Sequence, residues 1–255
     1  DGRSLNLKAL SILKEIPRDV PLFMIVHYMD VHNWSNRLHR KSDSKKSAIG
    51  PVEGKKSYAD SVKDCDQYMN ELLSVLSSQR GLDKSMIVFF SDHGEHLFEP
   101  PMQILFHGHT MQEPLLHVPF VVKYPSSVGI KPQVTDRVVS LVDLAPTILD
   151  LVGLNSSADR LDGISLLQAS SNDGNESRTL FADYQLFGDE LSSVRRGPIK
   201  LVINLTRNKD VLMDFSKPSS PTLGERGQMV MDLETRKSLR QAFFVYELDS
   251  KKRSQ

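Results

Sequence analysis

The sequence predicts an α/β fold, a three-layer sandwich in which helices cover a mainly parallel sheet. Segments with helical apolar spacing alternate along the chain with short, continuous apolar runs, which are typical of strands buried on both faces. Histidine and acidic residues directly follow these runs, at the strand ends where α/β sheets bind ligands. We expect this α/β part to span residues 1–178, and a small antiparallel sheet to follow in residues 179–255.

The predicted helices are residues 5–16, 58–76 and 143–153. In the first, apolar side chains have a helical spacing and a proline follows. In the second, apolar residues recur at steps of three and four, which places them on one face of an amphipathic helix. The third has Asp143 as a candidate N-cap and a glycine at its end. Residues 33–57 are polar without periodicity, so we expect an exposed loop there.

Three continuous apolar runs, residues 22–26, 86–90 and 118–124, are the predicted strands of the parallel sheet. After residue 178 the character of the chain changes. Short stretches of apolar, partly alternating residues are separated by turn residues, which favours an antiparallel sheet. These later predicted strands are residues 199–205, 211–215, 229–233 and 243–248.

Charge and cysteine content exclude several classes of protein. The 255 residues carry 32 Lys and Arg against 32 Asp and Glu, so the formal net charge is zero and no nucleic-acid partner is expected. Because Cys65 is the only cysteine, neither an internal disulfide framework nor a cysteine-rich zinc module can form. No apolar run approaches the roughly 18 residues that a membrane span needs. Membrane association and oligomeric state stay open.

Residues 93–109 hold four of the eight histidines in the chain. Asp92 and His93 directly follow a predicted strand, where a carboxylate oxygen and an imidazole nitrogen can bind one divalent ion. This mixed ligand set suits Zn or Mn better than Ca, which prefers oxygen alone. The competing interpretation is a solvated polar loop with incidental histidines, but their density at a strand end favours a metal site.

A second polar group, His27, Asp30 and His32, follows the predicted strand 22–26. If both strands belong to one sheet, this group and Asp92 point into the same crevice. His32 is then a candidate contact for a phosphate or sulfate group, or the general acid for the leaving oxygen. We expect His27 to pack near the strand end, and Asp30 either to orient its neighbours or to cap the loop.

Several motifs together resemble the sulfatase family of the alkaline phosphatase superfamily. The motif SDHGE at residues 91–95 follows an apolar run, and HGHTMQEPLLHVPFVVKYP at residues 107–125 comes after it. Further similar stretches are VSLVDLAPTILDLVGL (139–154), LDGISLL (161–167), PLFMIVHYMDVHNW (21–34), SVRRGPIKLVIN (193–204) and FFVYELDSKKRSQ (243–255). Their order and spacing cover nearly the whole chain. The resemblance implies an alkaline phosphatase-like fold and the activity of a sulfuric ester hydrolase.

The resemblance also implies roles for individual residues. Asp92 and His93 stand where the family has ligands to one divalent metal ion, which is Ca, Mn or Zn. His32 aligns with the histidine that contacts the bound sulfate or phosphate. His107, together with His109, stands where many members place a lysine or histidine on the substrate oxyanion. Preorganised donors at that place stabilise the charge of the transferring group.

The nucleophile of the family has no counterpart in residues 1–255. Members use a formylglycine made from Cys or Ser, within a Cys/Ser-X-Pro/Ala-X-Arg motif, or a Thr, and this sequence lacks that motif. Cys65 lies on the apolar face of a predicted helix and is followed by Asp66, so we expect it to be a core residue. We therefore expect this chain to be the C-terminal half of a longer enzyme and to be inactive alone.

The resemblance leaves alternatives open. A phosphodiesterase, a phosphonate hydrolase or a phospho-group transferase of the same superfamily shares the Asp-His pair, and the sequence does not separate sulfate from phosphate. A non-catalytic binding domain is a third candidate. The expected substrate is a sulfate ester, or a phosphoester, of a small molecule or a glycan. The compartments typical of the family are the periplasm, the lysosome and the extracellular space.

Overall fold

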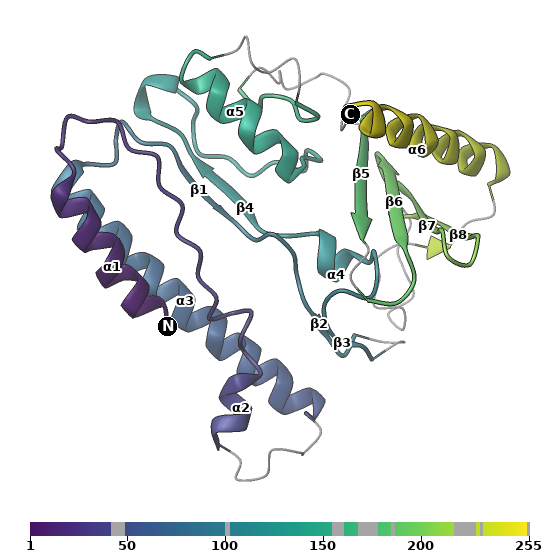
Figure 1. Cartoon of the computed structure of the whole chain (residues 1–255), viewed down its shortest axis with the longest axis horizontal. Helices are drawn as coiled ribbons and strands as arrows, with labels where there is room; N and C mark the ends of the chain where they lie inside the picture. Colours follow the sequence, from purple (N-terminus) through teal and green to yellow (C-terminus); the bar gives the residue numbers. More distant parts are fainter. Residues whose placement is uncertain are drawn as a thin grey trace. The chain divides into compact units, whose positions relative to one another are not determined.

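A computed structural model of the chain describes residues 1–41, 49–99, 103–154, 161–167, 178–184, 187–216, 228–229 and 232–253. The chain divides into two compact units, whose elements Figure 1 labels. Unit 1 comprises Asp1–Phe89 and Phe120–Lys131, and unit 2 comprises Phe90–Pro119 and Pro132–Gln255. The domain boundary predicted at residue 178 stays a prediction.

Unit 1 is built on two packed helices, α1 (Gly2–Glu15) and α3 (Pro51–Arg80). The buried side chain of Asn6 links them, because its Nδ2 donates to the carbonyl of Tyr68 over 2.8 Å. The Oδ1 of Asn6 in turn accepts a hydrogen bond of 2.6 Å from the hydroxyl of Tyr28. The first two predicted helices are therefore confirmed.

Helix α3 begins earlier than predicted, and the expected exposed loop at residues 33–57 is wrong in part. Residues 51–57 form the first turns of α3, and the short helix α2 (Asn36–Lys41) precedes them. The buried face of α3 continues into these turns with small residues, Gly54 and Ser57, in place of large apolar ones. A pattern of large apolar residues therefore does not reveal the start of this helix.

The apolar run 22–26 is not a buried strand. Within the described residues it has no strand partner, and Phe23 is 73% exposed.

Strands β1 (Ile87–Phe90) and β4 (Phe120–Lys123) pair with each other, and a 3-10 turn, η1 (Ser126–Val128), follows β4. Both strands keep exposed side chains, so burial on both faces is also wrong for the described part of the chain. An apolar run is buried only where other strands and helices cover it. The mainly parallel sheet stays a prediction.

Unit 2 begins with the loop after β1. This loop contains a two-stranded antiparallel hairpin of β2 (His96–Leu97) and β3 (Leu105–Phe106), and then the single turn α4 (Glu113–Leu116). Further along, the 3-10 turn η2 (Leu141–Asp143) leads into α5 (Leu144–Leu151). The third predicted helix is therefore confirmed.

Asp143 has a larger role than the predicted N-cap. Its fully buried carboxylate accepts hydrogen bonds from the N–H groups of Ser140 and Ile164 and from the guanidinium of Arg178. Burial by itself raises the pKa of this carboxyl, but Arg178 and the two N–H groups bring the pKa below its ordinary value. The ionised Asp143 therefore ties α5 to two distant segments of unit 2.

Five antiparallel strands, in the order β5-β6-β7-β8-β9, form the sheet predicted for the C-terminal part. Strands β6, β7 and β8 share one core, to which β7 contributes Leu201 and Ile203, two residues apart on one face of the strand. The neighbouring strands contribute Val194 of β6 and Leu212 of β8. Strands β7 and β8 match two of the predicted strands. The five strands are β5 (Thr179–Tyr184), β6 (Leu191–Arg196), β7 (Ile199–Asn204), β8 (Lys209–Asp214) and β9 (Gln228–Met229).

The last predicted strand, residues 243–248, is wrong, because helix α6 (Leu233–Arg253) occupies it. The aromatic and β-branched residues there favour a strand locally. In the structure Leu239 and Phe243 both pack into the core of the five-stranded sheet, and their spacing of four residues is that of a helix face. Of the predicted strand 229–233, Met229 belongs to β9 and Leu233 to α6, and residues 230 and 231 lie outside the described residues.

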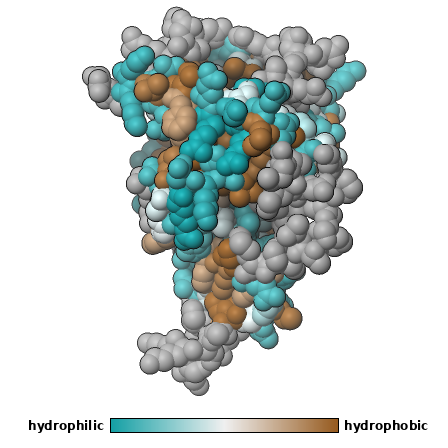
Figure 2. Space-filling model, turned by 90° about the vertical axis from the view of Figure 1, so that its right-hand side faces the viewer, coloured by the Kyte–Doolittle hydropathy of each residue, from teal (hydrophilic) through white to brown (hydrophobic). Residues whose placement is uncertain are grey.

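The outer side of α6 carries single hydrophobic residues, such as Leu248, which is 61% exposed. On the face of the molecule in Figure 2, hydrophobic residues likewise lie among hydrophilic ones. Scattered residues of this kind do not by themselves indicate a partner. None of the described helices is both long enough and apolar enough to cross a bilayer.

The apolar segment at residues 20–29 predicts self-association of the chain 1–255. Val20, Leu22, Phe23, Ile25 and Met29 are each at least 40% exposed, and several exposed apolar side chains within one short segment favour association. Replacing Phe23 and Ile25 by serine should shift the chain towards the monomer in size-exclusion chromatography with light scattering. The control is Val134→Ser, since Val134 is 98% exposed but lies outside this segment. A wild-type chain that is monomeric at the same concentration would contradict the prediction.

Cys65 should be nearly unreactive in the folded chain. Burial in α3, with a smaller contribution from Asp30 and Asp66, raises the pKa of its thiol to about 11. The thiolate is the reactive form, so alkylation by iodoacetamide at pH 8 should be slower than in the urea-unfolded chain by about 100-fold or more. Labelling followed by mass spectrometry measures both rates. Equal rates would show that Cys65 is not in the core.

Candidate functional site

Asp92 and His93 directly follow β1, as the sequence predicts. The side chain of Asp92 is 66% exposed, and its Oδ1 accepts the backbone N–H of His93 over 3.0 Å. Its Oδ2 lies 3.9 Å from Nε2 of His93. Two ligand bonds of about 2.1 Å span at most about 4.2 Å, so these two atoms can bind the same ion.

A hydrogen bond sets the tautomer of His93. Its Nδ1 lies 2.8 Å from the carbonyl oxygen of Gly94, and a carbonyl oxygen only accepts. Nδ1 therefore carries the hydrogen, and in the neutral ring Nε2 carries the lone pair. Metal-binding histidines typically use one ring nitrogen as ligand while the other donates to a carbonyl or carboxylate. The geometry of His93 thus fits a metal ligand.

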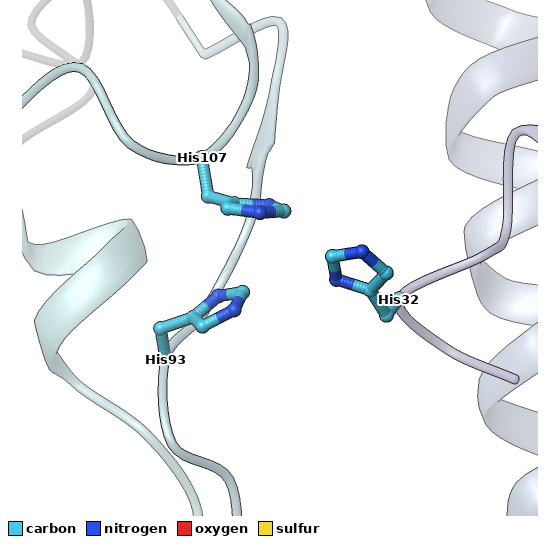
Figure 3. Close-up of side chains that lie close together, drawn as sticks. All are labelled: His32, His93 and His107. Carbon is cyan, nitrogen blue, oxygen red and sulfur yellow. The ribbon is translucent and has the colours of Figure 1, made fainter. Parts of the chain in front are cut away.

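Glu95 holds His107 in a defined orientation. The Glu95 side chain is only 6% exposed, and its Oε1 lies 3.1 Å from Nδ1 of His107. An ionised carboxylate only accepts, so the hydrogen is on Nδ1 of His107. The His107 ring lies against that of His93, with ring centroids 4.2 Å apart and an interplanar angle of 36° (Figure 3). Figure 3 also labels His32, which belongs to unit 1.

The backbone on both sides of His107 is in the left-handed region. Phe106 has a φ angle of 72° and Gly108 one of 87°. Glycine adopts such angles without cost, but for Phe106 they cost about 1–3 kcal/mol. Strain of this size persists only where surrounding contacts hold the chain. Tertiary contacts therefore hold the loop that carries His107.

The buried side chain of His96 stabilises the loop that carries the other histidines. The Nε2 of His96 lies 2.9 Å from the hydroxyl of Thr110, and its Nδ1 lies 3.3 Å from the carboxylate of Glu99. These contacts connect β2 with the segment that follows His109. His96 is thus a structural member of the histidine-rich segment.

Gly94 lies where the histidine-bearing loop touches α4. Its N–H donates to the carbonyl of Leu115 over 2.8 Å. A Cβ at this position would lie 1.9 Å from the carbonyl oxygen of Pro114. Only glycine lets two backbones approach this closely. The segment that carries His93 and Glu95 is therefore fixed against α4.

Two other histidines lie apart from this pair. His109 is exposed, and its ring centroid lies 5.9 Å from that of Phe187. Its predicted role at the substrate oxyanion stays a prediction. His27 is exposed as well, so its predicted packing near a strand end is wrong.

In unit 1, His32 lies in a turn that leads into α2. Trp34 anchors this turn, since its side chain is fully buried and its carbonyl accepts the hydroxyl of Ser57 over 2.7 Å. A salt bridge of 2.5 Å between Arg37 and Asp64 ties the following helix to α3. His32 itself is exposed, which suits a residue that contacts a substrate.

Glu95 is the residue of this site for which the sequence patterns predicted no role. It is the last residue of the SDHGE motif, and a carboxylate near a predicted ligand is a candidate to orient it. Its partner His107 is twelve residues away, however, and that contact depends on the β2–β3 hairpin. Spacing along the chain could therefore suggest Glu95 but not its partner.

Known proteins are similar to this chain in sequence and in fold. A family model described as Sulfatase matches residues 4–154. Arylsulfatase K of Rattus norvegicus is 36% identical over 110 residues, which are 43% of this chain and 18% of that protein.

Two solved structures are similar in fold. One, from Bacteroides thetaiotaomicron and described as a sulfatase, has a TM-score of 0.72 at 17% identity, and the match covers 95% of this chain and 61% of that protein chain. The other, a phosphonate monoester hydrolase of Silicibacter pomeroyi, has a TM-score of 0.58 at 17% identity, and the match covers 93% of this chain and 51% of that protein chain.

The structural likeness shows that the chain has the alkaline phosphatase-like α/β fold of these neighbours. The chain spans less than two thirds of the length of each of the three proteins.

Gly94→Ala should destabilise the protein by about 2 kcal/mol or more, because the new Cβ overlaps the carbonyl oxygen of Pro114. The control is Gly188→Ala. Gly188 also has a positive φ, of 82°, but no atom lies within 4 Å of its added Cβ, so only the backbone strain of about 1 kcal/mol remains. Urea unfolding measures both changes. Equal losses for the two variants would show that Gly94 is not packed against α4.

Proposed function

The chain belongs to the sulfatase family, and we propose that it supplies part of the active site of a metal-dependent sulfuric ester hydrolase. One observation carries this proposal. Glu95 holds the ring of His107 against the ring of His93, and His93 lies beside Asp92. A structural surface loop has no need of two histidines with set tautomers and a buried carboxylate. The same arrangement would supply a metal ligand and an anion contact next to each other.

Asp92 and His93 would hold one divalent ion, Ca, Mn or Zn, through the carboxylate and Nε2. The two atoms are close enough for one ion, and because Nδ1 donates to the carbonyl of Gly94, Nε2 is the ring atom that would bind the metal. When bound, the ion would offset the negative charge of a sulfate group. The oxygen of Asp92 and the nitrogen of His93 suit Mn and Zn better than Ca.

His107 and His32 would act on the substrate itself. Because Glu95 binds Nδ1 of His107, Nε2 is the atom of that ring that would face a sulfate oxygen. In the imidazolium form, Nε2–H donates to the oxygen on which charge develops. His32 would contact the sulfate or protonate the leaving oxygen, as the resemblance of residues 21–34 to the family implies. His109 is a second candidate for the oxyanion contact.

The nucleophile would come from outside residues 1–255. The motif that carries it in the family is missing from this sequence, and Cys65 is buried with a raised pKa. Residues 1–255 alone should therefore not turn over a sulfate ester. We propose a small-molecule or glycan sulfate ester as the substrate, and the lysosome, the periplasm or the extracellular space as the compartment.

A phosphonate monoester hydrolase is the second candidate function. The likeness in fold to the enzyme of Silicibacter pomeroyi favours it over other phosphoryl chemistry. Asp92, His93 and His107 would serve a phosphonate oxygen in the same way as a sulfate oxygen. A third candidate, a binding domain without catalysis, would bind an anion at the same residues but would show no turnover in any context.

A substitution series tests the proposal in the full-length protein, meaning the natural polypeptide that contains residues 1–255. Asp92→Ala and His93→Ala should abolish metal-dependent hydrolysis of an aryl sulfate, because the ion loses a ligand. His32→Ala and His107→Ala should lower kcat/KM by about 100-fold or more, the usual cost of losing an acid–base or oxyanion partner. Initial rates with an aryl sulfate and an aryl phosphonate, with and without EDTA, measure these effects.

Cys65→Ala is the control for this series, and its turnover should be close to wild type because Cys65 lies in the core. Full activity of Asp92→Ala would contradict the proposal. Faster turnover of the phosphonate than of the sulfate would favour the second candidate function. Turnover of neither substrate would favour the binding domain.

A further inference from the structure

The five-stranded sheet contains a buried lysine that the proposed function does not use. Lys200 of β7 is 1% exposed, and its Nζ donates to Oε1 of Glu113 over 2.9 Å and to the carbonyl oxygen of Met111. Arg195 of β6 donates to the other carboxylate oxygen, Oε2 of Glu113, over 2.9 Å. Two cations of the sheet thus hold one carboxylate of α4.

This arrangement is a poor way to stabilise a fold. Arg195 and Lys200 lie directly opposite each other on β6 and β7, and like charges in that position repel. Both cations lie over the ring of Phe215, at 5.0 and 5.9 Å from its centroid. Apolar residues of similar volume in place of a buried ion cluster are often equally stable or more stable. The cluster is therefore better explained by the position at which it holds the start of α4 on the sheet.

Glu113 is held as a carboxylate. Burial by itself raises its pKa, but Lys200 and Arg195 bring the pKa below its ordinary value. The two charge-assisted bonds therefore persist at neutral pH, and such bonds are shorter and more directional than neutral ones. They place the first residue of α4 at a defined position on the sheet.

A short series of contacts leads from this position to the candidate site. Glu113 begins α4, and the next two residues, Pro114 and Leu115, carry the carbonyl groups that meet Gly94. Gly94 stands between His93 and Glu95 in the sequence, and Glu95 holds His107. A shift of α4 would move the backbone of His93 and Glu95, because the Gly94 N–H is bonded to the carbonyl of Leu115, and it would move the ring of His107 through the side chain of Glu95.

We propose that Lys200, Arg195 and Glu113 form a brace through which the five-stranded sheet positions His93, Glu95 and His107. Lys200 and Arg195 are positioning residues: they act through α4 and contact neither metal nor substrate. This inference rests on the proposed function for its effect on catalysis, but the positioning itself is measurable without turnover. The competing account is that the brace only stabilises unit 2.

The chain offers a matched control on the same sheet. Asp210 of β8 is 1% exposed and accepts hydrogen bonds from Arg240 over 2.6 Å and from Arg236 over 3.2 Å, both of α6. This cluster, like the brace, joins two cations to one carboxylate, but it ties the sheet to α6 and not to α4. Arg240→Met should therefore cost stability without moving the site.

The first experiment is hydrogen–deuterium exchange of the full-length protein, with Lys200→Met, Arg195→Met and Arg240→Met compared to wild type. In Lys200→Met, peptides covering residues 92–96 and 105–108 should exchange faster by about tenfold or more, because the Gly94–Leu115 bond opens more often. Arg195→Met should have a smaller effect of the same kind, and Arg240→Met should leave these peptides unchanged. Thermal unfolding of each variant gives the accompanying loss of stability.

The second experiment measures kcat and KM with an aryl sulfate at saturating Mn²⁺. Lys200→Met should lower kcat by about 10-fold or more with KM changed by less than about 2-fold, since small displacements of reacting groups cost rate. Arg240→Met, with a similar loss in Tm, should keep both constants. If Lys200→Met does not fold, Arg195→Met and Glu113→Gln take its place, because each leaves part of the brace.

The two proposals fail in different ways. If wild type hydrolyses neither the sulfate nor the phosphonate ester, the proposed function fails, and the exchange experiment still decides on the brace. If Lys200→Met and Arg195→Met exchange in residues 92–96 as slowly as Arg240→Met does, the brace does not position the site and the inference is overturned.

Discussion

The close contact between Gly94 and α4 is the constraint on which the candidate site depends. The N–H of Gly94 donates to Leu115, and its Cα meets the carbonyl of Pro114 with no room for a side chain. His93 and Glu95 flank this contact, so their directions follow from it. The ring of His107 is then placed by Glu95 and by His93. The proposed metal ligand and the proposed anion contact are thus held next to each other by one glycine that packs against one helical turn.

Buried charges connect this site loop to the rest of unit 2. Glu113 is held by two cations of the antiparallel sheet, and Asp143 is held by Arg178. Each cluster joins segments that are far apart in the sequence, where an apolar contact would give less control of orientation. The C-terminal sheet accordingly does more than enclose its own hydrophobic core. Its position matters to the site because Lys200 reaches Met111 and Glu113 from β7.

The sequence predicted best those features that depend on neighbouring residues. Helices α1, α3 and α5 and strands β7 and β8 follow from apolar spacing and turn residues. The strand at residues 22–26 and the strand in place of α6 were wrong, because in both cases the tertiary surroundings decide. For the candidate site, the histidine-rich motif after a strand predicted Asp92 and His93, and the resemblance to the family predicted His107; the roles of all three stay predictions. The partners Glu95 and Lys200 were not predicted, because their contacts span 12 and 89 positions of the chain.

A crystal structure of the full-length protein with Mn²⁺ and sulfate would test the central claim most directly. The account predicts anomalous density for Mn²⁺ bound to the carboxylate of Asp92 and to Nε2 of His93. It also predicts sulfate oxygens within hydrogen-bond distance of Nε2 of His107 and of His32. Mn²⁺ and sulfate bound elsewhere, with Asp92 and His93 in contact with neither, would contradict it.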